Sequence, residues 1–347
     1  MTWTRRHMLQ LGGAAIAAGA LPSLAGSATS DPKIIRPPRL KEGDLVGLIG
    51  PAGATFFPDR AELARENLAA LGLRVQFGDH LMDRYGYLAG RDEDRAADIN
   101  AFFANPEVKL VLAQGGGWGC NRLLPLLDYD LIRKNPKVVM GFSDVTGLDL
   151  GIHAKTGLVT FYGPMGGSSW SAFTTDYARR VLFDAEAVTM RNLVTTEDRL
   201  VQIENKVLTI TSGKARGRLV GGNLTVLTAL VGTDYLPDFD GCILFIEDVH
   251  EEVYRVDRML TQLGLAGVLA KISGLVFGRC TDCEPSERYG SLTLPEVLAD
   301  HVGTLGVPAW YGSMIGHIKN YFTVPEGIEA EIDATAGTIT LLEPAVV

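Results

Sequence analysis

Cysteine is scarce in this chain, with four residues among 347. Cys280 and Cys283 form a C-x-x-C pair, but no second pair stands at a zinc-binding spacing, which argues against a structural metal. A local disulfide would suit an oxidising compartment, and the sequence leaves open whether the two cysteines are bonded. We interpret the pair as structural or incidental.

Long hydrophobic runs and an excess of positive charge are also lacking. Beyond the first 30 residues, no apolar run is long enough to span a bilayer. The net charge is −9, which argues against nucleic acid as a partner. Hydrophobic residues make up 46% of the chain and charged residues 21%, a balance typical of a globular protein with a real core. The length predicts one large or two medium domains.

The first 30 residues (1–30) have the pattern of an export signal. Arg5 and Arg6 precede a short apolar stretch from Leu11 to Leu21, and small residues that offer cleavage sites follow. The arginine pair resembles a twin-arginine signal, although Met8 stands where such signals usually have phenylalanine. An uncleaved membrane anchor is the alternative, but the apolar stretch is short for it. We expect a periplasmic or exported protein without a stable membrane anchor, or a cytoplasmic one if the leader is not functional.

Apolar runs and helical patterns alternate in the first half of the chain, which predicts a parallel sheet in an α/β layer. In the first predicted helix, Leu63 and Leu68 lie on the apolar side. Binding loops are expected at the carboxyl ends of the strands. The predicted strands are 44–50, 74–77, 108–113 and 138–141, and the predicted helices are 59–71, 92–105 and 121–127.

The pattern weakens after this first domain, which we place at 41–165. Residues 166–213 are interpreted as a linker with a helix near 176–183, and residues 214–344 as a second domain. Residues 214–222 of that domain are basic and rich in glycine. Strands are predicted at 242–246, 273–277 and 307–311, helices at 223–230, 254–263 and 294–304, and a terminal hairpin from 329–333 and 338–342.

Ser143 lies at a strand–turn–helix corner, where the apolar run 138–141 stops and helix-compatible sequence follows. Such a corner can lift a hydroxyl out of a sheet as a nucleophile, and a helix start leaves free N–H groups for a developing oxyanion. The local motif, Gly-Phe-Ser-Asp, differs from the G-x-S-x-G of common hydrolases. A role for Ser143 as a helix N-cap is therefore the alternative.

A serine nucleophile needs a base, and histidine is the side chain whose ordinary pKa lies near neutrality. His317 follows a predicted strand and a glycine, a plausible position for a catalytic loop residue, although a surface-loop histidine would look the same. Glu247 follows the apolar strand 242–246, where a carboxylate can be buried and hold an imidazole in one tautomer. Its alternative role is an acid at a helix N-terminus.

The glycine-rich segment Gly115–Gly119 follows another predicted strand and has two interpretations. A phosphate cradle is disfavoured because the P-loop spacing and its lysine are missing. We favour a close approach of the backbone to a reacting carbonyl, with a glycine N–H as oxyanion donor.

Taken together, these segments resemble the LD-carboxypeptidase family of serine peptidases, the muramoyltetrapeptide carboxypeptidases. The resemblance spans about residues 41–342, in order. It is carried by Tyr87–Asp92, Gly116–Gly119, Gly141–Asp144, Gly163–Met165, Gly221–Leu224, Ile246–Val249, Tyr254–Leu260 and Gly316-His317.

The resemblance implies a triad in which Ser143 is the nucleophile, His317 the base and Glu247 the orienting carboxylate. It also implies that the backbone N–H groups of Asp144 and of a glycine in the pair Gly116 and Gly117 bind the oxyanion and the substrate. The implied fold is an N-terminal Rossmann- or flavodoxin-like α/β domain with a C-terminal, mainly β (α+β) domain that supplies the Glu and the His. A homodimer is implied, with no metal and no cofactor.

In one position the chain departs from the family pattern, and this position bears on how the carboxylate of the substrate is bound. Many members of the family have arginine before the glycine pair, where this chain has Gly115, so the group that holds the carboxylate is open.

The expected activity is hydrolysis of the terminal D-alanine from murein tetrapeptides. One alternative is a related peptidase that cleaves a peptidyl-nucleotide antibiotic, for which Trp118 or Trp170 could clamp a base. The other is a non-catalytic protein that binds muropeptides in the same cleft.

Overall fold

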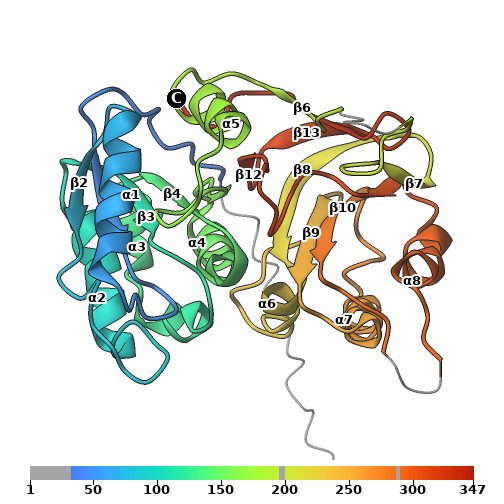
Figure 1. Cartoon of the computed structure of the whole chain (residues 1–347), viewed down its shortest axis with the longest axis horizontal. Helices are drawn as coiled ribbons and strands as arrows, with labels where there is room; N and C mark the ends of the chain where they lie inside the picture. Colours follow the sequence, from blue (N-terminus) through green and yellow to red (C-terminus); the bar gives the residue numbers. More distant parts are fainter. Residues whose placement is uncertain (1–32, 195–199, 287–289) are drawn as a thin grey trace, which may run out of the picture. The chain divides into compact units, whose positions relative to one another are not determined.

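The first half of the chain folds around a six-stranded sheet of order β12-β5-β4-β3-β1-β2 (Figure 1). In this computed structural model, which describes residues 33–194, 200–286 and 290–347, five of the strands run parallel and β12 is antiparallel. The strands are β1 (Leu45–Ile49), β2 (Arg74–Phe77), β3 (Val108–Ala113), β4 (Val138–Gly141), β5 (Phe161–Tyr162) and β12 (Val324–Pro325). The helices of this half are α1 (Pro58–Ala70), α2 (Asp92–Ala104), α3 (Tyr129–Lys134) and α4 (Thr146–Thr156).

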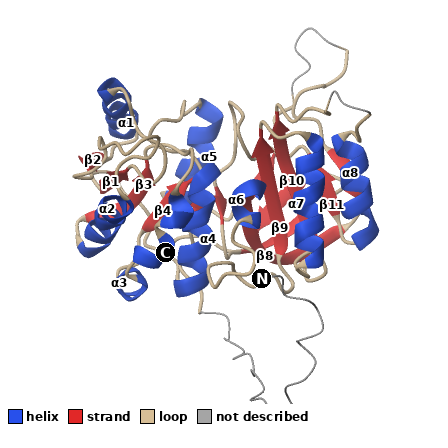
Figure 2. Ribbon diagram, turned by 90° about the horizontal axis from the view of Figure 1, so that it is seen from below, coloured by secondary structure: helices blue, strands red, loops and turns tan. Residues whose placement is uncertain are grey.

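The second half folds around an eight-stranded sheet of order β6-β14-β13-β8-β9-β10-β11-β7. Its four strands β8, β9, β10 and β11 are parallel, and the outer strands pair antiparallel. Figure 2 shows α6, α7 and α8 against these parallel strands. The elements are α5 (Ala172–Leu182), β6 (Thr189–Arg191), β7 (Leu208–Thr211), β8 (Lys214–Asn223), α6 (Leu224–Thr228), β9 (Ile243–Val249), α7 (Val253–Leu265), β10 (Gly274–Thr281), α8 (Leu294–His301), β11 (Ala309–Tyr311), β13 (Glu329–Asp333) and β14 (Thr338–Leu341).

The fold class predicted from the sequence is therefore confirmed: a parallel α/β half precedes a sheet-rich half. The segment interpreted as a linker, 166–213, holds α5 and both edge strands of the second sheet, β6 and β7. In the same way, β12 comes from the C-terminal part of the chain but completes the first sheet.

Strand β8 was not predicted, because its sequence is basic and glycine-rich and such residues are depleted in strands. The glycines allow a close approach between strands. A Cβ atom on Gly221 would lie 1.7 Å from the carbonyl oxygen of Phe245 in β9, so only glycine fits there.

Two local predictions are wrong. The helix expected at 121–127 is instead two short 3-10 turns, Cys120–Arg122 and Leu124–Leu126, because Pro125 lacks the N–H that a continuous helix needs. Leu63 of α1 does not face the core, since 55% of it is exposed, whereas Leu68 is buried as expected.

Helix α4 packs against β8 and α6, so the two halves meet directly behind the end of β4. One continuous buried cluster includes Val145 and Leu148 from the first half and Leu224 and Ile246 from the second. The junction is thus part of the core, and residues from both halves can be held in fixed positions there.

The leader predicted at 1–30 lies outside the described residues. Among the helices within 33–194, 200–286 and 290–347, none is both long and apolar enough to cross a membrane.

Candidate active site

Ser143 sits where β4 ends, at the start of a 3-10 turn, Ser143–Val145, that leads into α4. Its φ angle is +64°, a left-handed conformation that is costly for a residue with a Cβ atom. Gly141 makes the tight corner feasible, because a Cβ atom there would lie 2.6 Å from the side chain of Val145. The corner projects the hydroxyl of Ser143 away from the sheet, as a nucleophile requires.

A chain of hydrogen bonds links Ser143 to two residues of the second half. The Nε2 atom of His317 lies 3.0 Å from Oγ of Ser143, and its Nδ1 atom lies 2.8 Å from Oε2 of Glu247. With the proton on Nδ1, the imidazole donates to Glu247 and accepts from the hydroxyl of Ser143. The edge of Phe142 packs on the imidazole, with ring centroids 5.1 Å apart. The structure thus brings together the three residues that the sequence singled out.

Gly316 allows the loop of His317 to reach Glu247. Its φ angle is +125°, and a Cβ atom there would lie 2.6 Å from the carboxylate of Glu247. A larger residue would push the imidazole away from its partner.

Glu247 lies within β9 and is completely buried, yet its carboxylate is fully hydrogen-bonded. The hydroxyl of Tyr162 donates to Oε1 at 2.6 Å, and the side-chain amide of Asn223 donates to the same atom at 3.1 Å. With the imidazole on Oε2, three donors surround one carboxylate. Such donors favour the charged form and offset the cost of burying it.

Tyr162 also contacts the nucleophile, because its hydroxyl accepts the backbone N–H of Ser143 at 3.1 Å. Burial, and next the charge of Glu247, raises the pKa of Tyr162 well above its usual value. The hydroxyl therefore keeps its proton and stays a donor to Glu247. Tyr162 ties the strained corner to the orienting carboxylate.

Asp248, the next residue in β9, anchors Asn223 from the other side. Its carboxylate accepts from the amide of Asn223 at 3.0 Å and from the backbone and hydroxyl of Thr225 at 3.0 and 2.8 Å. Burial, and then the nearby charge of Glu247, raises the pKa of Asp248 to about 6. Asp248 makes no hydrogen bond with His317 and acts on the site through Asn223.

The predicted oxyanion donors lie beside Ser143. The N–H of Asp144 belongs to the first turn of a helix, where N–H groups lack intrahelical partners. Gly116 is adjacent, since a Cβ atom on it would lie 3.1 Å from Cβ of Ser143, whereas Gly117 packs on Gly53. The carboxylate of Asp144 accepts the N–H of Cys120 at 2.8 Å and so ties the glycine-rich loop to the corner.

A cleft of about 1000 Å³ opens in front of this group. Gly115 lines it, and a Cβ atom on Gly115 would meet nothing within 4 Å, so this position leaves open space. Trp118 and Trp170, considered from the sequence as clamps for a base, do not line the cleft. The other lining residues include Phe56, Phe57, Asp59, Arg60, Leu63, Phe142, Ser168, Ser169, His317, Lys319 and Tyr321.

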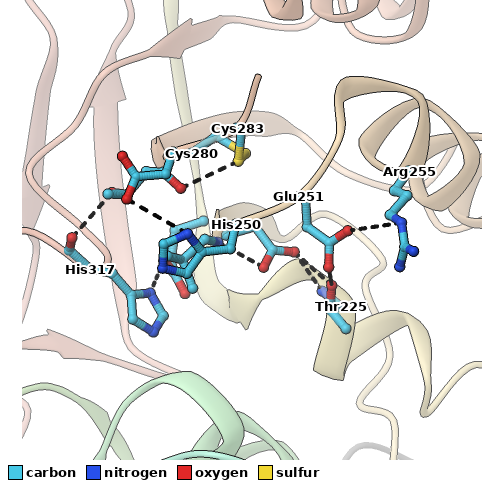
Figure 3. Close-up of a disulfide and its surroundings, with 12 residues drawn as sticks. Thr225, His250, Glu251, Arg255, Cys280, Cys283 and His317 are labelled. Carbon is cyan, nitrogen blue, oxygen red and sulfur yellow. Dashed lines mark hydrogen bonds and ion pairs between the residues drawn. A yellow bond between two sulfur atoms is a disulfide. The ribbon is translucent and has the colours of Figure 1, made fainter. Parts of the chain in front are cut away.

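Cys280 and Cys283 form a disulfide next to the loop of His317 (Figure 3). The bond closes the turn at the end of β10. Within that turn, the hydroxyl of Thr281 donates to the carbonyl of His317 at 3.1 Å. Just before it, the N–H of Arg279 donates to the carbonyl of Ile315 at 2.9 Å. The disulfide therefore supports the backbone that carries the imidazole.

The described residues offer one group of side chains that could hold a metal ion, His80, Asp83 and Asp94. It includes no member of the hydrogen-bonded chain around Ser143. The Nδ1 atom of His80 already pairs with Asp83 at 2.8 Å, and exposed acidic groups of this kind are common without an ion. The Cys pair is occupied by its own disulfide.

Sequence analysis missed Tyr162 as part of the site and assigned no role to Asn223. Both reach the site through hydrogen bonds to Glu247, which lies 85 and 24 residues away in the chain. Asn223 stood in a recognisable motif, Gly221–Leu224, which was the one local signal available.

Comparison with known proteins agrees with the resemblance. Residues 46–163 match the model of the LD-carboxypeptidase N-terminal domain, and residues 216–332 match that of the LD-carboxypeptidase C-terminal domain.

Similar proteins cover nearly the whole chain. A probable murein peptide carboxypeptidase of Bacillus subtilis is 39% identical over 88% of this chain and 94% of its own length. The murein tetrapeptide carboxypeptidase of Pseudomonas aeruginosa is 31% identical over 83% of this chain and 92% of its own. Among solved structures, the microcin C7 self-immunity protein MccF, known from Escherichia coli, matches with a TM-score of 0.81 and 28% identity, over 90% of this chain and 100% of that one.

Proposed function

This chain is a carboxypeptidase of the LD-carboxypeptidase family, and we propose that it hydrolyses the terminal D-alanine from murein tetrapeptides by a Ser–His–Glu mechanism. The observation that carries the proposal is the hydrogen-bonded chain from Ser143 through His317 to Glu247, in which His317 lines an open cleft. The names of the relatives from Bacillus subtilis and Pseudomonas aeruginosa support the choice of substrate.

The proposed reaction is acyl transfer in two steps. Oγ of Ser143 attacks the carbonyl before the terminal residue while its proton passes to Nε2 of His317. The N–H groups of Asp144 and Gly116 stabilise the oxyanion, and the imidazolium protonates the departing amine of D-alanine. Water, deprotonated by the same imidazole, then hydrolyses the acyl-enzyme. Glu247 stays ionised throughout and holds the imidazole in the required tautomer.

The test is D-alanine release from a defined murein tetrapeptide, followed by mass spectrometry. We expect Ser143→Ala to lower kcat on the order of 10⁴-fold or more and to abolish labelling by a fluorophosphonate probe. Ser169→Ala is the matched control, because Ser169 lines the same cleft but has no place in the hydrogen-bonded chain. Wild-type rates in Ser143→Ala would refute the nucleophile. Absence of both hydrolysis and labelling in the wild type would favour a non-catalytic binding protein.

The fold likeness to the microcin C7 self-immunity protein supports a second candidate, cleavage of a peptidyl-nucleotide. The same assay decides between the two when a peptidyl-adenylate analogue is offered beside the tetrapeptide. We expect the higher kcat/KM for the tetrapeptide, because this chain is 39% identical to the probable murein peptide carboxypeptidase and 30% identical to the self-immunity protein.

We further propose that the chain is exported through its twin-arginine-like leader, that it lacks a stable membrane anchor, and that it acts as a homodimer. The support is the sequence pattern of residues 1–30 and the family resemblance. Replacing Arg5 and Arg6 by lysine should shift the protein from the exported to the cytoplasmic fraction. Light scattering of the mature protein should give twice the chain mass, and a monomer mass would refute the dimer.

A further inference from the structure

The charges that line the cleft differ in sign from the charge of the chain as a whole. The chain carries a net charge of −9, but the lining includes two permanent cations, Arg60 and Lys319, and only one acid, Asp59. A carboxypeptidase binds a substrate that ends in a free carboxylate, and a charge-assisted contact to a cation is the strongest way to recognise it. One of the two cations is therefore expected to hold that carboxylate.

The proton path decides on which side of Ser143 the carboxylate lies. Nε2 of His317 accepts the proton of Ser143 and must deliver it to the departing nitrogen. The departing residue therefore lies on the side of the imidazole. Its carboxylate is only two bonds from its nitrogen, so the cation that binds it must stand close to His317.

Lys319 meets this requirement and Arg60 does not. Lys319 follows His317 by two residues in the same loop and lines the same cleft. Arg60 belongs to α1, and its carbonyl accepts the side-chain amide of Gln114 at 3.3 Å. That contact places the backbone of Arg60 beside the start of the glycine-rich loop, which supplies the proposed oxyanion donor Gly116. Its guanidinium also lies over the ring of Phe57, 5.9 Å from the centroid.

The loop presents Lys319 from a well-anchored backbone. On one side, the carbonyl of His317 accepts the hydroxyl of Thr281 at 3.1 Å. On the other, the N–H of Tyr321 donates to the hydroxyl of Thr174 at 3.1 Å. Lys319 itself is exposed, and its ammonium forms no ion pair with any residue in the described part of the chain. The charge is therefore available to a ligand.

We infer that Lys319 binds the terminal carboxylate of the departing amino acid and so restricts the enzyme to free C-termini. The inference rests on the proposed function. It also accounts for the glycine at position 115, because the cation then comes from the loop of the base and not from the glycine-rich loop.

The experiment compares two substrates, a murein tetrapeptide that ends in D-alanine and the same peptide that ends in D-alaninamide. Wild type should prefer the free acid by roughly 10- to 100-fold in kcat/KM, the value of one contact to a charged group. Lys319→Met should lose about this factor on the free acid, mainly through KM, and less than about 3-fold on the amide. Lys319→Arg should restore the preference, and Arg60→Met should keep it.

The outcomes separate a failure of the inference on Lys319 from a failure of the proposed function. Fluorophosphonate labelling of Ser143 at the wild-type rate shows that a variant is folded. If Lys319→Met then keeps the preference for the acid, or if Arg60→Met loses it, the inference is overturned while the proposed function stands. If the wild type releases no D-alanine from the free acid, the proposed function fails, and the inference fails with it.

Discussion

Two regions in the described part of the chain bury carboxylates completely, one with hydrogen-bond donors around the carboxylate and the other without them. Glu247 accepts hydrogen bonds from Tyr162, Asn223 and His317. Asp149 of α4 and Glu326, next to β12, are just as buried, but none of their four carboxylate oxygens has a hydrogen-bond partner among the described residues.

The second pair is held together through Thr160. The hydroxyl of Thr160 donates to the carbonyl of Asp149 at 3.2 Å, and its carbonyl accepts the N–H of Glu326 at 2.8 Å. Burial raises the pKa of both carboxyls well above their usual range, and the charge of Glu326 adds to the effect on Asp149. Burial without donors thus disfavours the charged form of both carboxyls.

The difference shows that burial alone does not make a carboxylate useful for catalysis. A buried acid stays charged only where donors replace the water it has lost. Glu247 has those donors and can stabilise an imidazolium, whereas Asp149 and Glu326 have none. The comparison can be tested by making the same substitution in both regions.

The largest effect is expected from Glu247→Gln. The amide keeps the shape but removes the charge that orients and stabilises the imidazolium, so kcat should fall about 10³- to 10⁴-fold. Glu326→Gln is the matched control, because it is the same change at an equally buried glutamate and should leave kcat within about 3-fold of wild type. Equal losses in the two variants, measured by D-alanine release, would remove the distinction between the regions.

Tyr162→Phe should have the next largest effect. It removes the donor to Glu247 and the acceptor for the N–H of Ser143, so kcat should fall about 10-fold with KM unchanged. Tyr177→Phe is the control. The hydroxyl of Tyr177 likewise donates one hydrogen bond, to the carbonyl of Thr189, and accepts one, from the N–H of Arg191. If the two variants lost activity equally, Tyr162 would be a structural residue only.

The disulfide should contribute a smaller effect, since it supports His317 through one contact from Thr281. Replacing both Cys280 and Cys283 by serine should lower kcat roughly 3- to 10-fold, the value of about one hydrogen bond. A dithiol reductant should lower the wild-type rate by the same factor and leave the double variant unaffected. If thiol titration shows that the disulfide is reduced and the wild-type rate is unchanged, the disulfide does not support His317.

The smallest effect, one on the stability of the fold, is expected from Glu326 in the pair with Asp149. Because the folded pKa of Glu326 is raised, the unfolded chain loses this proton first as pH rises above about 4. Wild-type stability should therefore fall with rising pH until the folded pair also ionises. In Glu326→Gln the contribution of Glu326 to this dependence is removed, whereas the contribution that burial gives to Asp149 remains.

Urea unfolding should then show that the variant gains stability relative to wild type as pH rises from about 4 to about 8. A difference that stays constant with pH would show that Glu326 is ionised in the folded state.

Much of the fold was predictable from the sequence because it depends on neighbouring residues. The apolar runs 108–113 and 138–141 correspond to β3 and β4 without adjustment. The helix predicted at 254–263 corresponds to α7, with Val256, Met259, Leu260 and Leu263 on its buried face. The same method missed β8, because its glycines serve the close approach to another strand and not an apolar pattern. It mispredicted the turns at 120–126, because Pro125 lacks the N–H group that a continuous helix needs.

The candidate site was predictable in part. Ser143, Glu247 and His317 could be named because each stands at a break in a local pattern, and the structure places them in one hydrogen-bonded chain. Their catalytic roles remain a prediction until the variants are assayed.

By itself, the sequence determined the strands and helices that have a regular apolar pattern, such as β3, β4 and α7, and the short motifs that interrupt them. Only the tertiary structure decided which polar groups meet. Ser143 and His317 are separated by 174 residues, and Tyr162 and Glu247 by 85. The physical reason is that apolar periodicity is a property of neighbours along the chain. Whether a buried carboxylate has hydrogen-bond donors depends on the residues that folding brings to it. Glu247 has such donors and Glu326 lacks them.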